Sequence, residues 1–148
     1  MKKFFGVIGN PPFDQSTLAS GDNGQFAPPM YDKFMEESFK VGDKVELVHP
    51  ARFLFNAGST PAEFNRRRLN DPHFKVLMYE QSSAKVFANT SIMGGIAVTY
   101  HDESEDFGAI GTFTPYEELN SIVRKVSNYP GFESLVEIIY QQDKFDLD

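Results

Sequence analysis

Asn10, Pro11, Pro12 and Phe13 follow directly on an apolar run, Phe4 to Gly9, and their types suit group transfer to an amine on a planar ring. The lone pair of such an amine is delocalised into the ring. A site that accepts both amine hydrogens draws the nitrogen towards a tetrahedral, nucleophilic form. The side-chain oxygen of Asn10 can accept one hydrogen and the backbone carbonyl of Pro11 the other, while Phe13 offers a flat face on which a base can stack.

The two prolines make these acceptors rigid. Each proline fixes its own φ and restricts the residue before it, and a fixed arrangement of acceptors is what electrostatic catalysis requires. The chemistry needs no strongly shifted pKa, which suits a chain with no cysteine and three widely separated histidines. A plain turn is the other interpretation, because Asn and Pro both favour turns.

The composition limits the function classes. The 148 residues amount to one domain, and the net charge of −7 gives no global electrostatic footprint for nucleic acid. No stretch approaches the length of a membrane span. The lack of cysteine excludes disulfides and thiolate metal sites, and the histidines form no ligand pattern. We therefore expect a cytoplasmic protein with no metal site.

Hydrophobic periodicity and turn residues predict an α/β fold. We expect Gly42 to cap the first helix, Thr60 and Glu63 to form a capping box, and the Gly94-Gly95 pair to mark a bulge. The alternation of elements indicates a mainly parallel sheet, with the last two strands as an antiparallel pair because no helix is evident between them. The expected strands are 3–9, 44–50, 73–81 and 91–102, and the expected helices are 30–41, 60–71, 114–126 and 132–142.

The segment VIGNPPF resembles the catalytic motif of amino-group methyltransferases that use S-adenosylmethionine, chiefly DNA adenine-N6 methyltransferases. Residues 30–55 resemble the helix and strand that follow this motif. Residues 73–100 resemble the next strand pair of large restriction–modification methyltransferases, a group that includes combined endonuclease–methylase proteins. Residues 132–145 resemble the lead-in to a target-recognition domain.

The resemblance implies a partial Rossmann-like methyltransferase fold. Residues 1–128 would form the catalytic-loop half of a methyltransferase domain, and residues 129–148 a helical lead-in towards an absent target-recognition domain. The family's glycine-rich cofactor turn lies upstream of the motif, whereas only nine residues precede Asn10. We therefore expect a fragment, with its cofactor-binding residues unknown.

The expected partners follow from the same resemblance. DNA would bind in the full-length context, and S-adenosylmethionine would bind this chain alone weakly or not at all. Strands that precede Lys3 in the family are missing, so the first strand should present an unpaired edge, and such edges favour association. The isolated chain is therefore expected to form a homo-oligomer, most simply a two-fold dimer.

Three further features are candidates for substrate contact. Arg52 follows the second predicted strand and could face the substrate cleft, although such an arginine is more often an ion-pair partner. Phe87, in the loop 82–91, could line a pocket for a flipped-out base or could plug the sheet. The run Arg66 to Arg68 could bind phosphates, but a solvated helix face with partners such as Glu63 is the favoured interpretation.

Two other functions fit the sequence. Protein-glutamine amide methyltransferases use a nearly identical Asn-Pro-Pro motif, because an amide nitrogen is also delocalised. The chain could also be a catalytically silent interaction module that docks to a second polypeptide. The strand pair that contains Gly94 and Gly95 favours the DNA enzymes.

Overall fold

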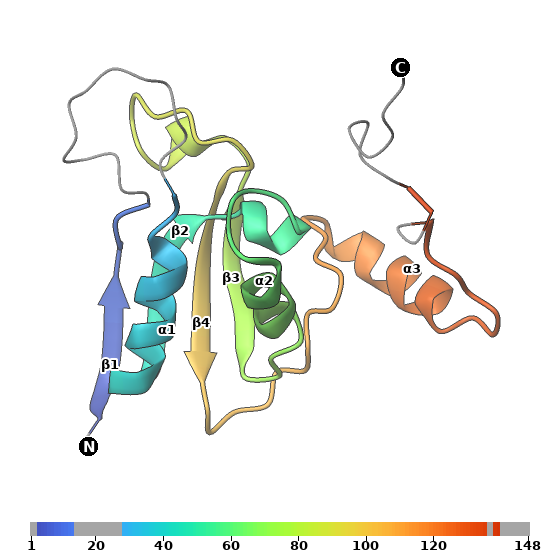
Figure 1. Cartoon of the computed structure of the whole chain (residues 1–148), viewed down its shortest axis with the longest axis horizontal. Helices are drawn as coiled ribbons and strands as arrows, with labels where there is room; N and C mark the ends of the chain where they lie inside the picture. Colours follow the sequence, from blue (N-terminus) through green and yellow to red (C-terminus); the bar gives the residue numbers. More distant parts are fainter. Residues whose placement is uncertain (1–2, 14–27, 136–137, 140–148) are drawn as a thin grey trace, which may run out of the picture. The chain divides into compact units, whose positions relative to one another are not determined.

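The computed structural model describes residues 3–13, 28–135 and 138–139, and Figure 1 shows the arrangement of its elements. The chain divides into two compact units, residues 1–113 and 114–148. The first unit contains the whole sheet, and the second contains helix α3 (Glu117–Ser127). The predicted functional division after residue 128 stays a prediction. The predicted helix 132–142 lies partly outside the described residues.

The first unit is built on a four-stranded sheet in the order β1-β2-β4-β3. β1 pairs with β2 in parallel, whereas β4 pairs with both β2 and β3 in antiparallel fashion. Three strands therefore run in one direction, and β4 lies among them in the opposite direction (Figure 1). The bounds are β1 (Phe4–Gly9), β2 (Gly42–Pro50), β3 (Phe74–Glu80) and β4 (Ile96–Asp102).

The α/β class and the antiparallel pairing of the last two strands are confirmed, but a mainly parallel sheet is not, because two of the three pairings are antiparallel. The connection between β3 and β4 explains the difference. It contains only a short 3₁₀ helix, Ser83–Lys85, whereas the crossover between parallel strands is usually an α-helix. β4 therefore comes back antiparallel and is inserted beside β2.

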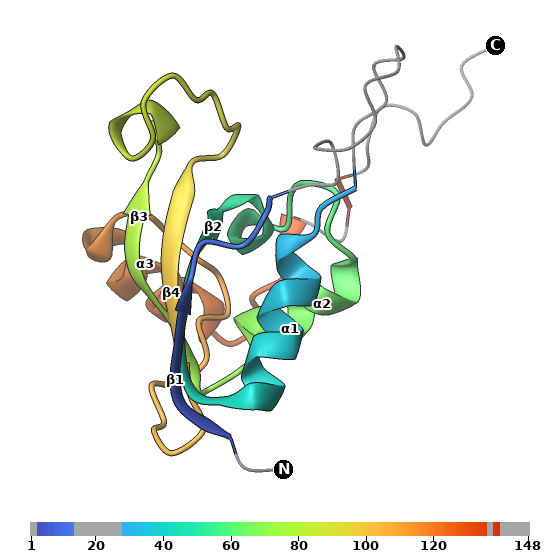
Figure 2. The same cartoon turned by 90° about the vertical axis from the view of Figure 1, so that its left-hand side faces the viewer.

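Helices α1 (Tyr31–Val41) and α2 (Ala62–Leu69) cover one face of the sheet (Figure 2). Phe53 lies fully buried between these helices and the sheet. Its ring contacts four other aromatic rings with centroid separations of 5.3–6.4 Å. Those rings belong to Tyr31, His49, Phe64 and Phe74. No described helix is both long and apolar enough to cross a membrane.

The predicted cap at Gly42 is confirmed, because Gly42 is the C-cap of α1 and its N–H donates to the Ser38 carbonyl. Gly42 has a φ of −115° and already belongs to β2, so it is not a left-handed cap. A Cβ atom built there would lie 2.7 Å from a methyl group of Val7 in β1. Glycine is therefore needed for the close approach of β1 to the start of β2, not for a turn conformation.

The predicted capping box at α2 is wrong. The helix begins at Ala62 and has no side-chain cap. The Thr60 hydroxyl instead donates to the side-chain oxygen of Asn65 at 2.7 Å, and Glu63 pairs with Arg66 at 2.6 Å. Because the Thr60 hydroxyl is bonded to the buried Asn65, it does not cap the free N–H groups of the first turn.

The Gly94-Gly95 pair precedes β4 and does not form a bulge within it. The two residues have φ angles of +88° and +81°, a region that residues with a Cβ rarely adopt. The register irregularity lies in β3 instead, between Val76 and Met78. The two glycines therefore shape the loop that delivers the chain into β4.

His49 is a fully buried packing residue. Its Nδ1–H donates to the Pro50 carbonyl at 3.1 Å, so the neutral ring has its free lone pair on Nε2. That nitrogen accepts from the Thr99 hydroxyl at 2.7 Å. Burial lowers the pKa of His49 from 6.5 to about 4, against a smaller raising effect of the hydrogen bond to Pro50.

This lowered pKa predicts a loss of stability in mild acid. Above pH 6.5 the ring is neutral in both states, but between pH 6.5 and about 4 only the unfolded chain takes up the proton. The free energy of unfolding should therefore fall by roughly 3 kcal/mol as the pH drops through this interval. Urea unfolding at both ends of the interval measures it. A His49→Gln variant should lose much less, and equal losses in both proteins would contradict the assignment.

Candidate functional site

The Asn10–Phe13 motif lies at the carboxyl end of β1. β2 is parallel to β1 and ends at the same edge of the sheet (Figure 1), which is where open α/β sheets bind ligands. Asn10 is exposed and Pro11 is buried. The side chain that could accept an amine hydrogen therefore faces outwards, while the proline behind it is fixed by packing.

Phe13 is tied to two other parts of the first unit. Its carbonyl accepts the backbone N–H of Met30 at 3.2 Å, which joins the motif to the start of α1. Its ring meets that of Phe87 with centroids 6.1 Å apart and planes inclined by 62°. The structure thus brings together Phe13 and Phe87, two residues that the sequence singled out separately.

Hydrogen bonds within the loop between β3 and β4 hold Phe87 in place. The Ser83 hydroxyl donates to the Thr90 carbonyl at 3.1 Å and accepts the Ile92 N–H at 2.8 Å. The Thr90 hydroxyl donates to the carbonyl of Phe87 at 2.7 Å. These bonds close the segment between β3 and β4, so the position of Phe87 beside Phe13 does not depend on that one ring contact.

Arg52 lies beyond the end of β2, where it begins a short 3₁₀ helix, Arg52–Phe55. The preceding Ala51 N–H donates to the Gly95 carbonyl at 3.0 Å, which joins this turn to the loop before β4. Among the described residues, no hydrogen bond or ion pair links Arg52 to the Asn10–Phe13 motif. The two share an edge of the sheet rather than a direct contact.

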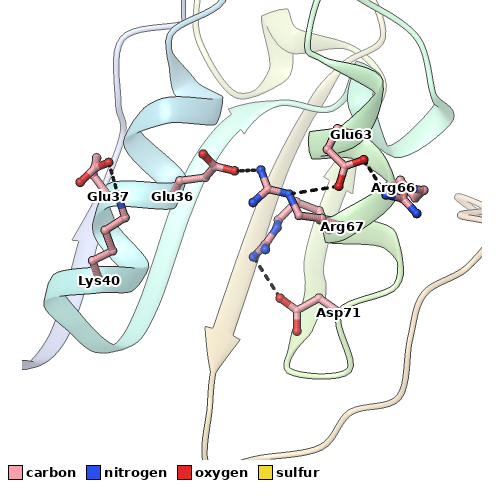
Figure 3. A network of polar contacts seen from close by, with 8 residues as sticks. Glu36, Glu37, Lys40, Glu63, Arg66, Arg67 and Asp71 are labelled. Atoms are coloured by element: carbon pink, nitrogen blue, oxygen red, sulfur yellow. Dashed lines mark hydrogen bonds and ion pairs between the residues drawn. The ribbon is translucent and has the colours of Figure 1, made fainter.

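The three consecutive arginines of α2 form a charge network, as the favoured interpretation predicted (Figure 3). Arg66 pairs with Glu63, Arg67 with Glu36 of α1, and Arg68 with Asp71. Each guanidinium therefore has a carboxylate partner within the protein. This face of α2 holds the two helices together and does not offer an unbalanced basic surface to a phosphate.

The first turn of α1 contains two buried polar residues that were not expected from the sequence. Tyr31 is 5% exposed, and burial raises its pKa to about 12 despite a hydrogen bond to Thr60. Asp32 is buried too, and its Oδ1 has no hydrogen-bond partner among the described residues. The only available signal was the Pro28-Pro29 pair ahead of the helix. In the described part of the chain, no three His, Asp or Glu side chains could hold a metal ion.

Comparison with known proteins decides the family. A family model described as Eco57I restriction-modification methylase matches residues 1–87. That range is more than half of the 148-residue chain. The chain belongs to this family. Searches of curated proteins and of solved structures gave no match.

The Eco57I match contains most of the candidate site. It spans β1, α1, β2, α2 and β3, and it ends at Phe87. β4 and the second unit lie beyond it. Membership of the Eco57I family confirms the predicted resemblance to restriction–modification methylases, and it supports DNA as the substrate of the family's methylation.

Proposed function

We propose that this chain provides the base-amine pocket of a DNA adenine-N6 methyltransferase that uses S-adenosylmethionine in a restriction–modification system. One observation carries the proposal. In a chain of the Eco57I family, the Asn10–Phe13 motif ends a strand at the ligand-binding edge, and its aromatic ring lies against a second ring, Phe87. A plain turn would require neither membership of the Eco57I family nor the contact between the Phe13 and Phe87 rings.

The motif acts on the adenine N6 amine. Asn10 Oδ1 and the Pro11 carbonyl each accept one N6 hydrogen, which concentrates the lone pair on nitrogen, and Pro12 holds the loop that carries both acceptors. S-adenosylmethionine, when bound, supplies an electrophilic methyl group. Transfer of this methyl group from sulfur to N6 would be direct and in line, without a covalent enzyme intermediate, and one N6 proton would leave afterwards.

The exposed side chain of Asn10 leaves the amine side of the pocket accessible. We assign no described residue to the cofactor. Weak or absent binding of S-adenosylmethionine by this chain alone remains our prediction, as does the need for a cofactor-binding half and a target-recognition domain.

The base stacks on Phe13. Phe13 and Phe87 meet at 62° and not face to face, so at least one face of Phe13 stays free of Phe87. Phe87 then acts as a wall that keeps the Phe13 ring in place. An adenine extruded from the duplex would lie on the open face of Phe13 with its amine towards Asn10.

Substitutions at Phe13 test this stacking. Phe13→Trp should retain activity because any aromatic face supports a base, whereas Phe13→Ala should lose about 1–3 kcal/mol of base stacking. The measurement is the affinity for duplex DNA with an unpaired adenine at the target position. The exposed Phe34 provides a matched Phe→Ala control. If Trp and Ala at position 13 weakened binding equally, Phe13 would be a packing residue.

Isotope transfer separates the proposed substrate from its main rival. Labelled S-adenosylmethionine is supplied to a polypeptide that joins these residues to a cofactor-binding half, together with DNA and with a glutamine-containing protein substrate. Label in the DNA is expected. Label in the protein alone would favour a glutamine amide methyltransferase and would contradict the proposal.

β1 lies at one edge of the described sheet, and this position favours association with a second polypeptide. β1 is the first strand of the sheet, and its residues Phe4, Phe5 and Ile8 are 69%, 79% and 84% exposed. Edges of this kind favour pairing with another polypeptide. We propose that the isolated chain self-associates through this strand. Such association would also suit an interaction module, but the Asn10–Phe13 motif favours the enzyme.

A further inference from the structure

We propose that Arg52 holds a phosphate group of the DNA backbone beside the target base, an inference that rests on the function proposed above. Arg52 stands at the edge of the sheet where β1 and β2 end, the same edge as Asn10. Three features of this arginine support the proposal: two glycines enclose its aliphatic stem, no described carboxylate pairs with its charge, and its position suits a phosphate.

The stem of Arg52 fits between two glycines. A Cβ atom at Gly94 would lie 2.4 Å from Arg52 Cγ, and one at Gly58 would lie 3.2 Å from Arg52 Cβ. Both glycines have positive φ, +88° and +96°. The two turns thus leave a slot that a side chain at position 94 would fill, and the slot aligns the arginine before any ligand arrives.

Within the described part of the chain, the charge of Arg52 has no counter-ion. Among the described residues no carboxylate lies in ion-pair distance of Arg52, whereas Arg66, Arg67 and Arg68 each have one. Arg52 interacts electrostatically with Tyr31: burial raises the pKa of Tyr31 to about 12, and Arg52 has a smaller lowering effect on it. Tyr31 is therefore neutral at physiological pH and cannot balance the guanidinium.

A backbone phosphate of DNA would balance the positive charge of Arg52. The planar guanidinium binds phosphate oxygens in a bidentate fashion, and phosphate contacts set the register of a protein on DNA. An aligned arginine without a carboxylate loses no ion pair when it takes up the phosphate. Because the Asn10–Phe13 motif needs an extruded base, a phosphate held at the same edge would fix the strand from which that base leaves.

Salt dependence measures the contact. The affinity for duplex DNA with an unpaired adenine is titrated against salt concentration in a polypeptide that joins these residues to a cofactor-binding half and a target-recognition domain. Each phosphate contact contributes about 0.9 to the slope of log K on log salt. Arg52→Met keeps the stem and removes the charge, so we expect the slope to fall by about 0.9. Arg66→Met, which removes an exposed arginine paired with Glu63, should leave it unchanged.

A second pair of variants tests the slot without touching the charge. Gly94→Ala places a methyl group on the Arg52 stem, whereas Gly108→Ala has a similar positive φ of +78° and meets no atom within 4 Å. Both carry the same backbone strain, so a difference between them reports on Arg52. Gly94→Ala should lower the slope as Arg52→Met does, and Gly108→Ala should not. Circular dichroism confirms that each variant is folded.

The outcomes separate the two proposals. If Arg52→Met and Arg66→Met changed the slope equally, or not at all, the phosphate role of Arg52 would be overturned while DNA binding by the chain stood. If the unsubstituted polypeptide, with its cofactor-binding half and target-recognition domain, showed no salt-dependent affinity for DNA, both the phosphate contact and the DNA substrate would be overturned together.

Discussion

Replacement of Asn10 by alanine is expected to slow methyl transfer by a factor of about 10²–10³ while DNA affinity stays nearly unchanged. Alanine removes one of the two acceptors that draw the adenine amine towards a nucleophilic geometry. That interaction strengthens only as the amine becomes tetrahedral, so its loss falls on the transition state and not on the bound complex.

Single-turnover rates of methyl transfer, measured in a polypeptide that joins these residues to a cofactor-binding half, give the size of this effect. Asn70→Ala is the matched control, because Asn70 is exposed and lies at the end of α2, where its side-chain amide donates to the Arg66 carbonyl. Near-normal turnover of the Asn10 variant would remove that side chain from the mechanism. A parallel loss of DNA affinity would make it a binding residue.

The second large effect is expected in stability. Phe53→Ala should lower the free energy of unfolding by about 3–5 kcal/mol, because it leaves a cavity at the centre of the aromatic cluster. Phe53 is 0% exposed and contacts rings from α1, β2, α2 and β3. Few other residues touch both helices and the sheet.

Urea unfolding measures this loss, and Phe34→Ala provides the control. Phe34 lies on α1 with 43% of its surface exposed, so its removal should cost much less. Comparable losses in the two variants would mean that the helices do not pack on the sheet through Phe53. A loss below about 1 kcal/mol at Phe53 would lead to the same conclusion.

Sequence reasoning located the elements because periodicity and turn residues are local signals. The predicted strand 3–9 is β1, Phe4–Gly9, and the predicted helix 30–41 is α1, Tyr31–Val41. It could not give the sheet order, since no local signal shows that β4 enters beside β2. It misread Thr60, whose hydroxyl bonds to Asn65 across a turn. It placed the cap at Gly42 but could not show that glycine is also needed there for the close approach of Val7, a residue distant in sequence.

The candidate site was predictable to the extent that its residues lie in one motif. Asn10 to Phe13 could be read directly, since the chemistry needs those types in that order. Phe87 was a weaker prediction, and only the fold brings its ring to Phe13. The slot around Arg52 was not predictable, because Gly58 and Gly94 belong to loops that meet only in the folded chain.

The position of the transferred methyl group tests the central claim most directly. DNA methylated by a polypeptide that contains these residues and a cofactor-binding half is digested to nucleosides and analysed by mass spectrometry. The account predicts N6-methyladenine in the product, with the yield strongly reduced by Asn10→Ala. The role assigned to the Asn10–Phe13 motif requires an amine whose hydrogens the motif can accept. A methyl group on a cytosine carbon, or on a ring nitrogen, would therefore contradict it.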